Sequence, residues 1–260
     1  MTARPLIIAH RGASSNAPEN TIASFRAAVE SGADGIEFDV RVAADGVPVV
    51  IHDATLKRTA GRNVRVGELT SAELAKIDVG SWFNTGRPKH ANAAFVKETV
   101  PTLPAVLALL ADFRGFVYIE LKCGLRSVGP LVDAVANLLR DSPLVARVII
   151  KSFRLAALSE MRHRVPNVQT AALFEPSVLN ILRRRRYIIE MAREFGAQQL
   201  SLHRSLITPK LARLARDAGM PLTVWTVDAP KWITRCQRLG ITALITNDPL
   251  RMLAARDGDR

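Results

Sequence analysis

The most constraining feature of this chain is a repeat of short apolar runs separated by helix-like segments. Because strands that alternate with helices pair in parallel through crossover connections, the repeat indicates an α/β fold. Eight such units close a (β/α)8 TIM barrel of typically about 250 residues. The eight predicted strands cover residues 6–10, 35–42, 116–121, 147–153, 168–174, 198–203, 221–227 and 242–246 of the 260. A doubly wound open sheet is the main rival, but the chain has no G-x-G-x-x-G or Walker sequence.

Between these strands, apolar residues recur at helical spacing, and residues typical of helix starts and ends bound the segments. Pro18-Glu19-Asn20 supplies a start and Gly32 an end for the first helix, predicted over 20–31. The other predicted helices cover residues 71–77, 102–112, 127–140, 154–163, 178–195, 208–218 and 229–238.

One connection is much longer than the usual loop of such folds. We interpret residues 54–100 as a small insertion after the second strand's hairpin that caps the barrel mouth, because long barrel loops often cover the site. Residues 1–260 are then a single barrel domain.

The hairpin itself is predicted from an Asp-Gly turn at Asp45-Gly46. A two-residue loop would pair Asp39 with His52 and bring that histidine beside the acidic residues of the second strand. A bulge of one residue would reverse the direction of His52.

Charged and aromatic residues stand at the predicted strand ends, where barrel enzymes place their chemistry. Alternate strand residues share a face, so Glu37 and Asp39 point together, and Glu120 is expected to converge on them. Three carboxylates offer hard oxygen ligands to one divalent cation, Ca²⁺ or Mg²⁺. Alternatively, the cations Arg11, Arg41 and Lys122 neutralise the acids in a structural ion-pair network.

Two histidines beside such a site have the chemistry for phosphodiester cleavage. His10 and His52 could move protons from the attacking hydroxyl and to the leaving oxygen. Arg11, Lys122 and the cation would hold the growing negative charge on the phosphate.

The order of motifs resembles the glycerophosphodiester phosphodiesterases over almost the whole chain. The shared motifs are HRG (10–12), PENT (18–21), GIEFDV (35–40), PVVIHD (48–53), IELK (119–122), KSF (151–153), WTVD (225–228) and ITNDP (245–249). The resemblance implies a (β/α)8 barrel with a small insertion after the second strand's hairpin. Two departures stand out: Asp228 occupies a position where many relatives carry Asn, and Cys123 directly follows the Glu-x-Lys motif.

The resemblance also implies roles for individual residues. His10 and His52 correspond to the acid/base pair, and Arg11 and Lys122 to phosphate contacts. Trp225 corresponds to an aromatic wall of the pocket, and the alternative for it is an ordinary core aromatic. The acids Glu37, Asp39 and Glu120 correspond to the cation ligands.

The implied reaction has two steps. The glycerol 2-hydroxyl attacks phosphorus and displaces the alcohol to give a cyclic phosphate, which water then opens to glycerol 3-phosphate. Two alternatives stay open: hydrolysis of lysophospholipids, with Trp82, Phe83 and Phe95 lining an apolar channel, and a barrel that binds phosphodiesters without turnover. The headgroup, the choice of ion, the oligomeric state, and the roles of His203 and Lys151 are not determined by the sequence.

The formal net charge of +12 favours anionic partners without naming them. For the run Arg183–Arg186 we favour a solvated helix face over nucleic-acid binding, because no aromatic residues are interleaved with it. Weak binding to anionic membrane surfaces stays open. Two cysteines are too few for a disulfide framework, and the N-terminal apolar run is too short for a signal or membrane segment, so we expect a cytoplasmic protein without membrane insertion.

Overall fold

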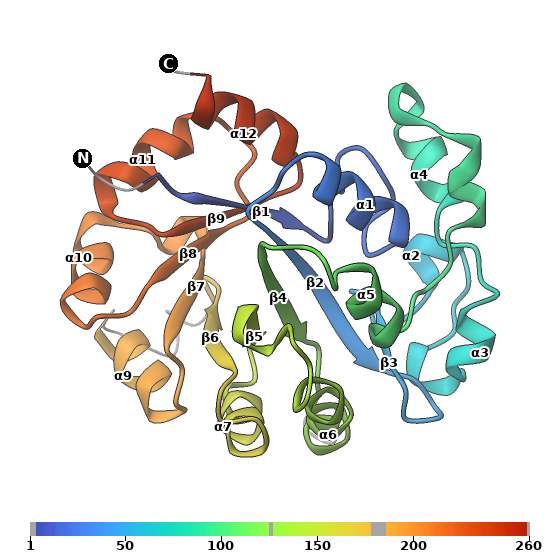
Figure 1. Ribbon diagram of the computed structural model, residues 1–260, viewed down its shortest axis with the longest axis horizontal. Helices are drawn as coiled ribbons and strands as arrows, with labels where there is room; N and C mark the ends of the chain where they lie inside the picture. Colours follow the sequence, from blue (N-terminus) through green and yellow to red (C-terminus); the bar gives the residue numbers. More distant parts are fainter. Residues whose placement is uncertain (1–3, 125–126, 178–185, 259–260) are drawn as a thin grey trace.

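Eight parallel strands form a closed ring with helices on the outside (Figure 1) in the computed structural model, which describes residues 4–124, 127–177 and 186–258. The ring closes because β1 pairs with both β2 and β9. This confirms the predicted TIM barrel, and each predicted apolar run contains one strand. The ring strands are β1 (Leu6–His10), β2 (Gly35–Val42), β4 (Phe116–Leu121), β5 (Val148–Ser152), β6 (Gln169–Phe174), β7 (Gln199–His203), β8 (Leu222–Trp225) and β9 (Ala243–Thr246).

Helices surround the ring at most of the predicted positions. The first begins later than predicted, because Thr21 caps it and forms a reciprocal capping box with Ser24. Of the helix predicted over 178–195, residues 178–185 lie outside the described part of the chain. The outer helices are α1 (Ile22–Glu30), α5 (Leu103–Leu109), α6 (Val128–Leu139), α7 (Leu155–Arg164), α9 (Arg186–Glu194), α10 (Pro209–Asp217), α11 (Lys231–Leu239) and α12 (Pro249–Asp257). Among the described residues, no helix combines the length and apolar character needed to cross a membrane.

The apolar core has two main layers. The larger lies between the strands and the outer helices, where Phe25 of α1 packs against Phe38 of β2. The smaller fills the ring interior and consists of Ile8, Tyr118, Ile149, Ala171, Ala243 and Ile245. Interior side chains of this kind make the barrel a packed core, so polar groups concentrate at its C-terminal end.

The hairpin after β2 differs from the predicted register by one residue. The short antiparallel strand β3 (Pro48–Val50) pairs Val42 with Pro48, and the Ile51 N–H donates to the Asp39 carbonyl (2.9 Å). The predicted pairing of Asp39 with His52 is therefore wrong. The loop holds three residues, 44–46, and Gly46 takes a left-handed conformation (φ 79°), which supplies the one-residue bulge.

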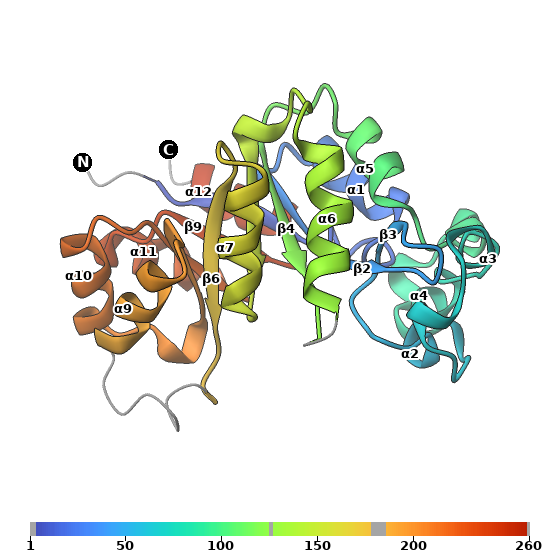
Figure 2. The ribbon, with the colours of Figure 1, turned by 90° about the horizontal axis from the view of Figure 1, so that it is seen from below.

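The insertion lies at one side of the ring, next to α1 and α5 (Figures 1 and 2). Its own buried side chains, including Leu56 and Leu74, pack against Val49 and Ile51 of the hairpin. The insertion is thus built directly on the hairpin. It contains α2 (Lys57–Ala60), α3 (Ser71–Leu74), α4 (Ser81–Gly86) and 3-10 turns at Val66–Glu68, Pro88–His90 and Ala93–Lys97.

Candidate active site

Charged side chains gather at the C-terminal ends of β1, β2, β4 and β5, where they line a cavity of about 190 Å³. Seven of the eight predicted site residues line it: His10, Arg11, Glu37, His52, Glu120, Lys122 and Trp225. The eighth, Asp39, is buried and forms ion pairs with Arg11 and Lys122. No residue of 54–100, a segment that the structure describes in full, belongs to this lining.

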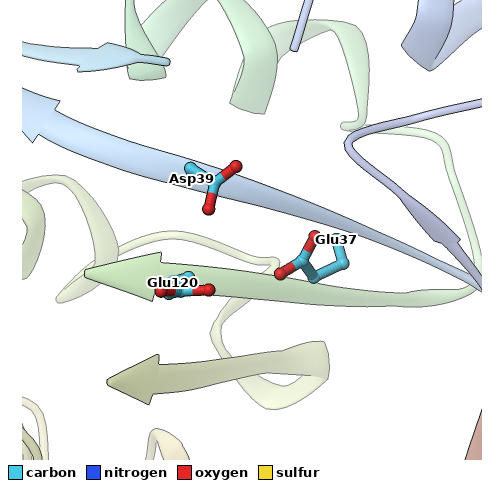
Figure 3. A group of neighbouring side chains, drawn as sticks. All are labelled: Glu37, Asp39 and Glu120. Atoms are coloured by element: carbon cyan, nitrogen blue, oxygen red, sulfur yellow. The ribbon is translucent and has the colours of Figure 1, made fainter. Parts of the chain in front are cut away.

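The three acidic side chains converge as predicted. Glu37 and Asp39 alternate along β2, and the β2–β4 register places Glu120 opposite Asp39. Glu37 and Asp39 project from β2 and Glu120 from the neighbouring β4 (Figure 3). One oxygen from each carboxylate lies within 4.8 Å of the others, and all three side chains are buried. Their oxygens could hold a hard divalent cation such as Ca²⁺ or Mg²⁺.

Three cations face these acids. Lys151 Nζ lies 2.9 Å from Glu37 Oε1 and is itself buried. Arg11 Nε lies 3.1 Å from Asp39 Oδ2. Lys122 Nζ lies 3.2 Å from Asp39 Oδ1 and also pairs with Glu120.

The alternative of a structural ion-pair network expected Arg41 to neutralise the acids, but Arg41 has a different role. Its guanidinium donates to the backbone carbonyls of His52 (2.8 Å) and Lys122 (3.3 Å). It therefore ties the hairpin to the end of β4, while Lys151 is the third direct partner of the acids. The sequence offered one signal for Lys151, a lysine within an otherwise apolar strand.

The acids differ in proton affinity. Burial alone would raise the pKa of Asp39, but the adjacent Lys122 and Arg11 hold it well below its usual range. Burial and the charge of Asp39 raise the pKa of Glu120 to about 7. Near neutral pH, Glu120 therefore binds a proton more readily than an ordinary carboxyl group, as expected where carboxylates crowd a site suited to a cation.

Because the folded state binds this proton more tightly than the unfolded state, the stability linked to Glu120 is full below pH 4.5 and declines as pH rises through about 7. In the presence of EDTA, we expect Glu120→Gln to raise the free energy of unfolding at pH 8 by about 1–3 kcal/mol. The gain should vanish near pH 4. Urea unfolding at both pH values measures it; equal gains at both would refute the electrostatic cause.

Both histidines direct Nδ1 to a side-chain oxygen. His10 Nδ1 lies 2.7 Å from Asn247 Oδ1, and His52 Nδ1 lies 2.7 Å from Asp53 Oδ1. Burial lowers the pKa of His10 against the opposing charge of Glu37, and burial likewise lowers the pKa of His52. Rings that stay neutral near pH 7 are able to accept a proton.

An ion-pair network that sequence reasoning missed connects the two histidine regions. Arg58 of α2 donates to Asp53 (2.7 Å) and to both oxygens of Glu19 (2.8 and 2.9 Å). Glu19 also accepts from Arg11 (2.8 Å). The insertion thus supports the Asp53 carboxylate behind His52, although it does not line the cavity.

The turn after β1 depends on a glycine. Gly12 has φ 80°, and a Cβ atom there would lie 2.5 Å from Ser24 Oγ. Gly32 has a similar φ of 75° with open space around it. Gly12→Ala should therefore lower the free energy of unfolding by more than Gly32→Ala, whose strain alone costs about 1–3 kcal/mol. Urea unfolding of the two variants tests the difference; equal losses would show that the contact with Ser24 is unimportant.

Aromatic rings form another wall of the cavity. Trp225 packs edge to face against Phe153 (5.8 Å between centroids) and His203 (5.2 Å). In contrast, Phe83 and Phe95 are buried in a separate cluster with Ala17. Those two phenylalanines therefore do not provide the apolar channel considered for a lysophospholipid.

Cys123 and Arg186 lie outside the cavity lining. Cys123 is half-buried, and burial raises the pKa of its thiol, which suits a packing role. Arg186 begins α9 and is exposed, with Glu190 one turn away (3.9 Å). The other three arginines of the run, 183–185, lie outside the described residues.

Comparisons with known proteins agree with one another. A model of the Glycerophosphoryl diester phosphodiesterase family matches residues 10–251. A glycerophosphodiester phosphodiesterase of Caldanaerobacter subterraneus is 34% identical over 246 residues, which is 95% of each chain.

Solved structures with the same fold cover nearly the whole chain. An Oleispira antarctica phosphodiesterase in complex with the product sn-glycerol-3-phosphate is 25% identical, with a TM-score of 0.85 over 98% of this chain and 97% of that one. A glycerophosphodiester phosphodiesterase from Agrobacterium tumefaciens is 29% identical, with a TM-score of 0.77 over 96% of this chain and 99% of that one.

Proposed function

Because the chain belongs to the glycerophosphoryl diester phosphodiesterase family and is thus a phosphoric diester hydrolase, we propose that it cleaves glycerophosphodiesters with two histidines and one divalent cation. The products are glycerol 3-phosphate and an alcohol. The observation that carries this proposal is the convergence of two imidazoles, three carboxylates and three cationic side chains on one cavity at the strand ends.

His10 and His52 supply the acid/base chemistry. One imidazole takes the proton from the glycerol 2-hydroxyl as its oxygen bonds to phosphorus; the other protonates the alcohol oxygen as its bond to phosphorus breaks. Water then opens the cyclic phosphate with the proton transfers reversed. The internal nucleophile is already held near phosphorus, which removes much of the entropic cost of the first step.

Glu37, Asp39 and Glu120 would hold the cation. Their buried oxygens lie close enough to share one ion, and the raised pKa of Glu120 marks a site that gains from an added positive charge. When bound, a hard divalent cation supplies electrostatic stabilisation of a phosphate. The choice between Ca²⁺ and Mg²⁺ depends on ligand number and flexibility, so we propose either ion.

Arg11 and Lys122 neutralise the phosphate charge. Both line the cavity as well as pairing with Asp39, so a phosphate can share these donors. Trp225, with Phe153, bounds the space left for the alcohol group.

Residues 1–260 work as one domain in this proposal. Segment 54–100 flanks the mouth and contributes through Arg58, which holds Asp53 behind His52. The free thiols Cys123 and Cys236 suit a reducing, cytoplasmic setting, and the positive charge permits weak contact with anionic surfaces.

Glycerol 3-phosphate release tests the proposed reaction. The purified protein is assayed with a panel of glycerophosphodiesters and lysophospholipids, first in EDTA and then with Ca²⁺ or Mg²⁺ restored. We expect release from glycerophosphodiesters that stops in EDTA and returns with at least one ion. Glu37→Ala should be inactive with either ion; full activity in that variant, or in EDTA, would overturn the role of the cation.

A further inference from the structure

The carboxylate of Asp228, in the loop after β8, lies against the side-chain amide of Asn247, in the loop after β9. Asp228 Oδ1 accepts from Thr246 Oγ1 and from the Asn247 backbone N–H, each at 2.8 Å. Asp228 Oδ2 accepts from Asn247 Nδ2, also at 2.8 Å. An ionised carboxylate can only accept hydrogen bonds, so the Asn247 side chain must turn its NH₂ group toward Asp228.

This orientation determines what the other end of the amide can do. The Asn247 Oδ1 atom faces His10 Nδ1 at 2.7 Å and also accepts from Ser14 Oγ (3.1 Å). An amide oxygen only accepts, so His10 must carry its hydrogen on Nδ1. A neutral imidazole has a single N–H, which leaves the lone pair on Nε2, the ring nitrogen 4.0 Å from Glu37 Oε2.

We propose that Asp228 is a positioning residue that acts through Asn247 to hold His10 in the Nδ1–H form, with Nε2 open to the cavity. The consequence for catalysis rests on the proposed function; the proton position itself does not. Asp228 is not one of the residues that line the cavity, and its side chain bonds to Thr246 and Asn247 rather than to His10, so its influence on the ring passes through the amide.

The two hydrogen bonds to Asp228 Oδ1 join the two loops and do not depend on which way the Asn247 side chain is turned. The third bond, from Asn247 Nδ2 to Oδ2, is the one that excludes the reversed amide, which would set its NH₂ group against the ring N–H and its oxygen against the carboxylate. His52 offers an internal comparison, because its Nδ1 contacts Asp53 directly and needs no amide to fix its proton.

NMR of the imidazole ring nitrogens, recorded without substrate or divalent ion and above the usual histidine pKa range, reports the proton position. Wild type should show His10 protonated on Nδ1. In Asp228→Ala, no carboxylate holds the Asn247 NH₂ group, so the amide can turn and His10 should become a mixture of both forms while His52 is unchanged. With substrate and ion, kcat should fall about 10- to 100-fold, the size of effect typical of groups that orient a functional histidine.

A double substitution, Asp228→Asn with Asn247→Asp, separates positioning from loop structure. The carboxylate would then accept from both His10 Nδ1 and the amide at position 228, so the Nδ1–H form and much of the activity should return. Asp133→Ala removes an exposed carboxylate on α6 and serves as the control for Asp228→Ala.

An unchanged His10 proton position in folded Asp228→Ala would overturn the proposal. If that variant does not fold, the double variant decides: Nδ1–H in it supports the proposal, and its loss refutes it. A proton position that responds as expected in a protein that never releases glycerol 3-phosphate would refute the proposed function and leave the positioning intact.

Discussion

Replacing His10 or His52 with alanine should lower kcat for glycerol 3-phosphate release by about 100- to 10,000-fold, the range expected when a general acid or base is lost. Each histidine lines the cavity, and each has Nδ1 held by a side-chain oxygen, which leaves the other ring nitrogen for proton transfer. The two losses should not multiply in the double variant, because proton removal and proton donation belong to the same displacement.

His163→Ala is the matched control for these variants. His163 is exposed on α7 and should leave kcat unchanged. Steady-state kinetics with saturating divalent ion measures all three single variants. Activity within a few-fold of wild type in a folded His10→Ala or His52→Ala protein would exclude that histidine from proton transfer.

The barrel and its acidic cluster were predictable because each depends on local patterns. Apolar runs gave the strands, and alternation along β2 placed Glu37 and Asp39 on one face. Only one further fact was needed to add Glu120, namely that the carboxyl ends of parallel strands meet at one end of a barrel.

The features that sequence reasoning missed depend on contacts between distant elements. The hairpin register depends on whether Gly46 adds a bulge, and the Asp-Gly pair is compatible with two- and three-residue loops. Arg58 bonds to Glu19, which lies 39 positions earlier in the sequence. Arg58 belongs to the insertion, and no apolar periodicity in the sequence predicts how the insertion packs. Helix α12 was not predicted, although its start has a local sequence signal, the Asp248 cap followed by Pro249.

Lys151 shows the same limit with a larger consequence. Its strand was predicted, but its partner Glu37 lies 114 residues away on β2. The pairing became visible only when the closed ring placed both side chains in its interior. Replacing Lys151 can distinguish a structural ion-pair network from a cation site, because Lys151 is the direct counter-charge of Glu37, one of the proposed cation ligands.

Lys151→Met should lower the free energy of unfolding in EDTA by about 3–5 kcal/mol, since it leaves the Glu37 carboxylate buried without its partner. Methionine is a flexible apolar side chain that can fill the vacated space, so the loss reports charge more than packing. The exposed Lys210→Met, on α10, is the matched control and should unfold like wild type.

Divalent ion should then restore stability in Lys151→Met by more than it stabilises wild type. In wild type, Lys151 already balances Glu37, whereas in the variant a bound cation becomes the main counter-charge for that carboxylate and binds more tightly. At a hundredfold excess over its dissociation constant, a ligand adds about 2.7 kcal/mol. Urea unfolding with EDTA, Ca²⁺ or Mg²⁺ measures the recovery. A variant that stays equally destabilised in both ions would mean that Glu37, Asp39 and Glu120 form a purely structural network with Lys151, Arg11 and Lys122.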